Sequence, residues 1–181
     1  MSDEELTDLA ADLRAYLAGC RDSKRELALL RRVRAQPQEM RQQLLVPLLD
    51  TNTDLVLEIA NRAQLSRAAY LAILQRGLDE ADASSIRHWL AATVLHLGWR
   101  KVFTVLRQEL AVKPRRVSFA LYHVPYLSFN KPFLSLPTTT ALMDEFCQLV
   151  ELCHRKGYVV CPDKQAFEAI RDRALRTTRS P

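Results

Sequence analysis

Three cysteines and a histidine near the end of the chain have the side chains best suited to bind a metal. Thiolate and imidazole groups are zinc ligands, and here they come from Cys147, Cys153, His154 and Cys161. On one helix Cys147 and His154 would share a face, whereas Cys153 would point elsewhere, and the closely spaced cysteine pairs of recognisable zinc sites are missing. Small buried side chains are the simpler interpretation. The sequence therefore predicts no metal and no cofactor.

Groups that could catalyse a reaction are not gathered in any readable motif. Asp144, Glu145 and Glu151 are expected to be surface charges along a helix, with the first two favoured near its N-terminus. His88 and His96 are expected on the surface or at the edge of the core. The four glycines of the chain argue against a glycine-rich phosphate loop. We therefore expect a protein that is not an enzyme.

The remaining composition favours a helical protein of the cytoplasm. Few glycines argue against an all-β fold, and 48% hydrophobic residues suffice for one substantial core. The opening residues are acidic and amphipathic, unlike a signal peptide, and no apolar run is long enough to span a membrane. The four cysteines are expected to be free thiols in a reducing compartment.

Positive charge is concentrated in the second half of the chain. Residues 1–97 hold 12 Lys and Arg against 14 Asp and Glu, whereas residues 98–181 hold 14 against 7. A net charge of +7 favours acidic partners such as nucleic acid, an acidic protein face or an anionic membrane surface. A basic surface kept for solubility remains the alternative.

Apolar residues recur at helical spacing through most of the chain, and the pattern is partly repeated. The segments that start at Leu44 and Ile73 each contain a helical stretch, a break after Leu-Asp at Asp50 or Asp79, and a second helical stretch. This pattern resembles HEAT-like repeats, which implies stacked antiparallel helix pairs that bind partners on a groove surface. We expect the repeats to occupy residues 1–112.

Capping residues and glycines indicate where these helices begin and end. Gly19 is expected to stop the first helix, and Pro47 to kink or end the third. Thr53 or Asp54 and then Ser66 are expected to cap the next two helices. Gly77 is expected to close the helix that Ser66 starts.

Residues 113–137 carry four prolines and five aromatic residues and are predicted to form an extended connector. Its aromatic rings either pin the connector onto the helices, which we favour, or form an exposed surface for a peptide or single-stranded nucleic acid. Residues 138–181 are predicted to form a basic helical cap with a long helix ending at Gly157 and a terminal helix opening at Pro162. The fold class is thus all-α, with one compact domain.

Residues 105–121 offer an alternative, because they resemble the helix-turn-helix of DNA-binding regulators. Leu106, Leu110 and Val117 match its buried positions, and Val112 matches its buried turn residue. The resemblance implies that Arg115, Arg116, Ser118 and Phe119 face the major groove. Arg107 departs from the pattern where a small residue is usual, and Pro125 should cut the second helix short. Arg155 to Val160 could add a recognition helix with a wing strand.

The sequence thus favours a helical binding module or scaffold that recognises a protein or another acidic partner through its basic second half. A DNA-binding regulator is the alternative. The residues expected to make these contacts are Arg100, Lys101, Lys113, Arg115, Arg116, Ser118, Phe119, Tyr122, Tyr126 and Lys131.

Overall fold

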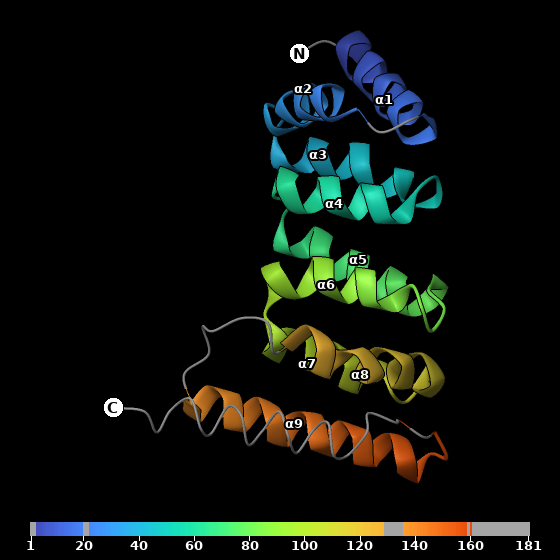
Figure 1. The fold of residues 1–181 in the computed structure, drawn as a ribbon, viewed down its shortest axis with the longest axis vertical. Coiled ribbons are helices and arrows are strands. Elements are labelled where there is room, and N and C mark those ends of the chain that lie inside the picture. Colours follow the sequence, from blue (N-terminus) through green and yellow to red (C-terminus); the bar gives the residue numbers. More distant parts are fainter. Residues whose placement is uncertain (1–2, 20–21, 129–135, 159, 161–181) are drawn as a thin grey trace. The chain divides into compact units, whose positions relative to one another are not determined.

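The fold is all-helical wherever the chain is described. The computed structural model describes residues 3–19, 22–128, 136–158 and 160. Within these ranges it contains α-helices and a 3-10 turn but no strand (Figure 1), which confirms the predicted all-α class. No helix in this part of the chain combines the length and the apolar character that crossing a membrane requires.

Two compact units make up the chain, residues 1–73 and 74–181, and the division falls within one helix. The elements of the first unit are α1 (Asp3–Ala18), α2 (Ser23–Arg34), α3 (Gln38–Leu45), the 3-10 helix η1 (Val46–Asp50) and α4 (Thr53–Ala63). Helix α2 packs on α1 and α4, and α3 packs on α4. The end of α3 before Pro47 and the end of α1 before Gly19 follow the prediction.

The helix that contains the division is α5 (Arg67–Glu80). Ser66 caps it as expected, because its hydroxyl oxygen accepts a hydrogen bond of 3.0 Å from the Ala69 amide. In the first unit, the Tyr70 hydroxyl donates to the Ala60 carbonyl at 2.9 Å, so α5 is tied to α4 by a buried bond.

The second unit holds four further helices, α6 (Ile86–Leu97), α7 (Trp99–Glu109), α8 (Pro114–Ser128) and α9 (Leu136–Arg155). Helices α7 and α8 lie between α6 and α9 and each packs on both of them (Figure 1). Gly98 joins α6 to α7 with a φ of 77°, a conformation that favours glycine. The apolar residues predicted to line α6, α7 and α9 are mostly buried.

The predicted connector is wrong over much of its length, because residues 114–128 form α8 with Pro125 inside it. Proline removes one backbone hydrogen bond from a helix. The helix persists because its apolar residues recur at helical spacing and are buried, which outweighs local propensity. They are Val117, Ala120, Leu121 and Val124. Residues 129–135 and the terminal helix expected from Pro162 lie outside the described residues.

Two local predictions are also corrected. Asn52, not Thr53 or Asp54, caps α4, since its side chain accepts from the Leu55 amide at 3.3 Å. Gly77 does not close α5, which continues to Glu80. Asp50 is the last residue of η1 and Asp79 the penultimate residue of α5, so each Leu-Asp pair stands at a helix end as predicted.

Candidate functional site

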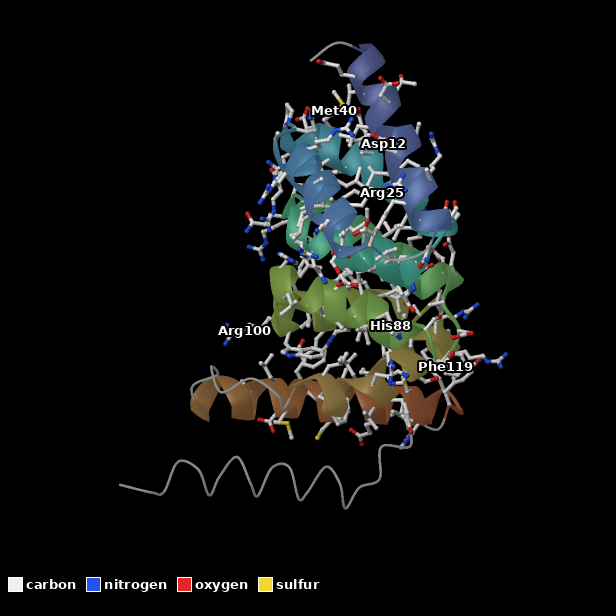
Figure 2. The ribbon with its side chains drawn as sticks, turned by 45° about the horizontal axis from the view of Figure 1, so that its top comes forward. Asp12, Arg25, Met40, His88, Arg100 and Phe119 are labelled. Carbon is white, nitrogen blue, oxygen red and sulfur yellow. The ribbon has the colours of Figure 1, made fainter. Side chains whose placement is uncertain are left out.

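The residues predicted to bind a partner lie in different places. Arg100 and Lys101 are exposed in the first turn of α7, while Phe119 belongs to α8, and Figure 2 shows Arg100 and Phe119 on opposite sides of the view. Tyr122 is 41% exposed on α8. Tyr126 lies in α8, but its side chain is not among those described, and Lys131 lies outside the described residues. The predicted set therefore does not form one continuous surface.

Three of the predicted residues do come together at the turn between α7 and α8. Lys113, Arg115 and Arg116 line a cleft of about 330 Å³, together with residues from the end of α5 and from the segment after α9. We call it the turn cleft; it is lined by Leu78, Asp79, Val112, Lys113, Pro114, Arg115, Arg116 and Tyr158.

Lys113 is held inside this cleft by two carboxylates. Its ammonium group pairs with Asp79 at the end of α5 and, at 2.9 Å, with Glu109 at the end of α7. Hydrogen bonds to Asp79 and then to Glu109 raise the pKa of the lysine above its ordinary value. Because its charge is balanced within the protein, Lys113 chiefly joins three helices.

Arg116 also has a structural contact, since its guanidinium donates to the carbonyl oxygen of Ala81, just past the end of α5. That carbonyl has no partner within its helix, so the arginine satisfies it. Ser118 is only 6% exposed, and its hydroxyl donates at 2.7 Å to the Arg115 carbonyl. The expectation that Ser118 faces a partner is therefore corrected, because burial removes it from the surface.

Arg115 differs from its two neighbours because its side chain points to solvent. The guanidinium carbon lies 5.5 Å from the centre of the Phe119 ring, a cation–π arrangement that orients the charge without neutralising it. Arg115 has no carboxylate partner among the described residues. It is the cation of the turn cleft best placed to meet an anion.

Val112 is 77% exposed at the rim of the same cleft. The helix-turn-helix pattern requires a buried residue at this position, so the structure departs from that pattern here. Pro125 also does not shorten the second helix. Leu106, Leu110 and Val117 are buried, as the pattern requires, but burial of these residues is expected in any helical pair.

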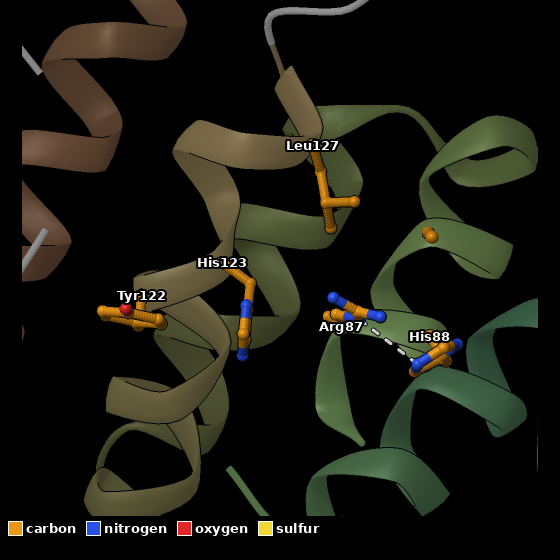
Figure 3. A pocket seen from close by; sticks show the side chains of 6 residues that line it. Arg87, His88, Tyr122, His123 and Leu127 are labelled. Carbon is orange, nitrogen blue, oxygen red and sulfur yellow. Dashed lines mark hydrogen bonds between the residues drawn. The ribbon is translucent and has the colours of Figure 1, made fainter. Parts of the chain in front are cut away.

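A second cleft, which the sequence did not reveal, lies between α6 and α8 and has a volume of about 560 Å³. We call it the histidine cleft; Arg87, His88, Ala91, Tyr122, His123 and Leu127 line it (Figure 3). Of these, only Tyr122 was predicted to make contacts. Helical spacing places His123 and Leu127 on one face of α8, a relation that arises only because this segment is a helix and not the predicted connector.

No group of three metal-binding side chains occurs among the described residues. Cys147 is exposed and Cys153 is buried, so the two thiols do not face a common site. Burial raises the pKa of Cys153 to about 11, which keeps the thiol protonated at neutral pH. His154 instead lies 3.3 Å from both backbone polar atoms of Val160. Cys161 lies outside the described residues.

Comparisons with known proteins found no similar protein, so the fold and the clefts alone describe this chain. No protein-family model matches it, and neither do any curated proteins or solved structures. The described residues define an all-helical protein whose second unit carries the turn cleft and the histidine cleft. The resemblance to HEAT-like repeats remains a prediction.

Proposed function

We propose that this protein is a non-enzymatic helical binding module whose turn cleft holds an acidic segment of a partner protein. The observation that carries the proposal is the exposed Arg115 guanidinium, stacked on Phe119 and without a carboxylate partner in the described structure. Val112 adds an exposed apolar contact beside it. A carboxylate with an apolar neighbour is the ligand that this pair of side chains complements.

The surplus of positive charge supports the same proposal. Residues 74–181 carry 16 Lys and Arg against 10 Asp and Glu, whereas residues 1–73 carry 10 against 11. A positive field around the cleft would speed the approach of an acidic partner and would be screened by salt. Arg115 would then fix the position of one carboxylate.

DNA binding through residues 105–121 has weaker support. The groups that were expected to meet the major groove are partly used inside the protein, since Arg116 contacts the Ala81 carbonyl and Ser118 is buried. The exposed Val112 breaks the expected packing of the turn. DNA binding therefore enters as an alternative outcome of the test.

Fluorescence anisotropy with a labelled peptide of Glu, Asp, Leu and Phe tests the proposal, with duplex and single-stranded DNA measured alongside across a salt series. We expect the acidic peptide to bind, and Arg115→Ala to weaken binding about tenfold or more, as loss of a central arginine contact does. Val112→Ser should weaken it by a smaller factor.

Arg100→Ala is the matched control, because it also removes one exposed arginine, at the end of α7 opposite to the turn cleft. Equal losses from Arg100→Ala and Arg115→Ala would contradict a site at the turn cleft. Tight, salt-sensitive binding of duplex DNA without binding of the peptide would support the DNA-binding regulator instead.

A further inference from the structure

The histidine cleft is a separate feature from the turn cleft, because the two share no lining residue. Its volume of about 560 Å³ lies within the range of pockets that hold small molecules. Three of its six lining side chains carry a positive charge or gain one on protonation, namely Arg87, His88 and His123, and none is acidic. Such a lining selects against cations and favours an anion.

Arg87 supplies a permanent positive charge that the described part of the protein leaves without a carboxylate. Its Nε donates to Nε2 of His88 at 3.2 Å, an interaction that orients the guanidinium but does not balance its charge. The two terminal amino groups of the guanidinium form a planar fork that matches the oxygens of a phosphate or carboxylate.

The two imidazoles are held from different helices. His88 accepts from Arg87 on α6, while His123 on α8 donates through Nε2 to the Ala83 carbonyl at 2.7 Å. In the view of Figure 3 the Arg87 guanidinium lies between the two rings. Because Nε2 of His88 accepts from Arg87, the N–H donor of that ring is Nδ1, whereas Nε2 of His123 donates to Ala83 and its Nδ1 becomes a second donor if the ring takes up a proton.

The rest of the cleft is apolar. Ala91 and Leu127 provide aliphatic lining, and the rings of Tyr122 and His123 meet edge to face with their centroids 5.0 Å apart. Bare inorganic ions gain nothing from such surface, whereas a compact hydrocarbon group does.

We propose that the histidine cleft binds a small organic anion, with its phosphate or carboxylate group at Arg87, His88 and His123 and its apolar body against Ala91 and Leu127. This inference does not depend on the proposed function, since it uses different residues and a different ligand class.

Proton NMR of the histidine Cε1–H signals tests the site directly, with phenyl phosphate and benzoate as probes. The sequence has four histidines, so His96 and His154, which do not line the cleft, serve as internal controls. We expect saturable shifts of the His88 and His123 signals, assigned with His88→Gln and His123→Gln, and little change in the other two. Binding of either probe supports the site and identifies the preferred head group.

Variants and related ligands separate this site from weak surface binding. Arg87→Gln should weaken binding about tenfold or more, as expected for loss of a charged hydrogen bond, while Arg107→Gln, which removes an exposed arginine beside α9, should leave it unchanged. Circular dichroism would verify that both variants fold.

Three results would overturn the inference. The first is an absence of saturable shifts with both probes, and the second is equal affinity for phenyl phosphate in Arg87→Gln and the unaltered protein. The third is equal affinity for inorganic phosphate or for benzyl alcohol, since these lack the apolar body and the charge respectively. None of these results bears on acidic peptide binding at the turn cleft.

Discussion

At the scale of single residues, Gly77 sets how closely α5 and α6 approach. A Cβ at this position would lie 2.7 to 2.8 Å from Cδ2, Cγ and Cβ of Trp89, which is 3% exposed. These atoms are near the root of a large buried side chain and cannot move away without a shift of α6. The sequence suggested a helix stop because glycine is common there, but close packing is the actual reason for this glycine.

We predict that Gly77→Ala lowers the free energy of unfolding by about 1–3 kcal/mol, the usual cost of overpacking a core. The clash must outweigh a gain of about 1 kcal/mol in helix propensity from alanine. Urea denaturation followed by circular dichroism measures the change. Gln75→Ala, at an exposed position of the same helix, is the control and should change stability little. A more stable Gly77→Ala protein would show that the helices can separate at no cost.

Asp82 organises the turn between α5 and α6. One carboxylate oxygen accepts from the Ser85 amide at 2.7 Å, and from the amide and hydroxyl of Ser84 at 2.9 and 2.8 Å. The bond from the Ser85 amide, followed by those from Ser84, holds the pKa of Asp82 well below its ordinary value. The ionised carboxylate therefore stabilises the fold above the ordinary pKa of aspartate, and this contribution is lost as the pH falls.

We predict that Asp82→Asn lowers the Tm at pH 7, because the amide oxygen can replace the acceptor but not its charge. The Tm difference from the unaltered protein should narrow as the pH falls below about 4, where an aspartate in the unfolded chain becomes protonated. Thermal denaturation at several pH values measures it. Asp54→Asn, another exposed aspartate at a helix start, is a suitable comparison. A difference that stays constant down to pH 2 would rule out the charge as its source.

At the scale of elements, one lysine joins the ends of three helices. Lys113 lies just before α8 and pairs with Asp79 of α5 and Glu109 of α7. Arg116 adds a bond from α8 to the Ala81 carbonyl. The elevated pKa of Lys113 means that its ammonium group stays charged through neutral pH, so a rise in pH breaks the pairing only in strongly alkaline solution.

A double-mutant cycle with Asp79→Asn and Lys113→Met should give a coupling of about 0.5–1 kcal/mol in the free energy of unfolding, the usual size for a pair near the surface. The coupling should shrink in high salt. The i,i+4 pair of Arg76 and Glu80 within α5 is the reference, because it joins no helices. A coupling indistinguishable from zero at low salt would mean that Lys113 does not hold α5 to the α7–α8 turn.

Helices with a clear apolar stripe could be predicted from the sequence, whereas α8 could not. Its buried residues, Val117, Ala120, Leu121 and Val124, have helical spacing, but prolines and aromatic rings nearby drew the interpretation toward a connector. Local propensity disfavours a helix at Pro125, and burial against α6 and α9 overrides it. The same error concealed the histidine cleft, because His123 and Leu127 meet Arg87 only if α8 is a helix.

At the scale of the whole molecule, the excess of positive charge in the second half of the chain could be predicted from composition. Which of these charged side chains can meet a partner could not. The sequence gives no distinction between Lys113, Arg115 and Arg116, since all three are basic residues beside a turn. Tertiary contacts separate them, because carboxylates neutralise the first, a helix-end carbonyl binds the third, and only Arg115 points to solvent. The basic side chains available to a partner are therefore those whose charge is not already satisfied by a contact inside the protein.

Two charge-reversal variants can distinguish general electrostatic attraction from binding at the turn cleft. Arg115→Glu and Arg25→Glu each change the formal net charge from +5 to +3, and both positions are exposed. Arg25, which is labelled in Figure 2, lies in α2 of the first unit. If net charge alone attracts acidic ligands, the two variants should lose affinity equally and with the same dependence on salt.

If the turn cleft is the site, Arg115→Glu should weaken binding of the acidic peptide by about a hundredfold, since it places two carboxylates together, while Arg25→Glu changes it by about twofold or less. Stopped-flow measurements divide the effect further. Loss of the specific contact appears in the dissociation rate of Arg115→Glu, whereas the change in overall charge lowers the association rates of both variants to a similar extent. Equal dissociation rates for the two variants would assign the binding to the general field of the protein rather than to Arg115.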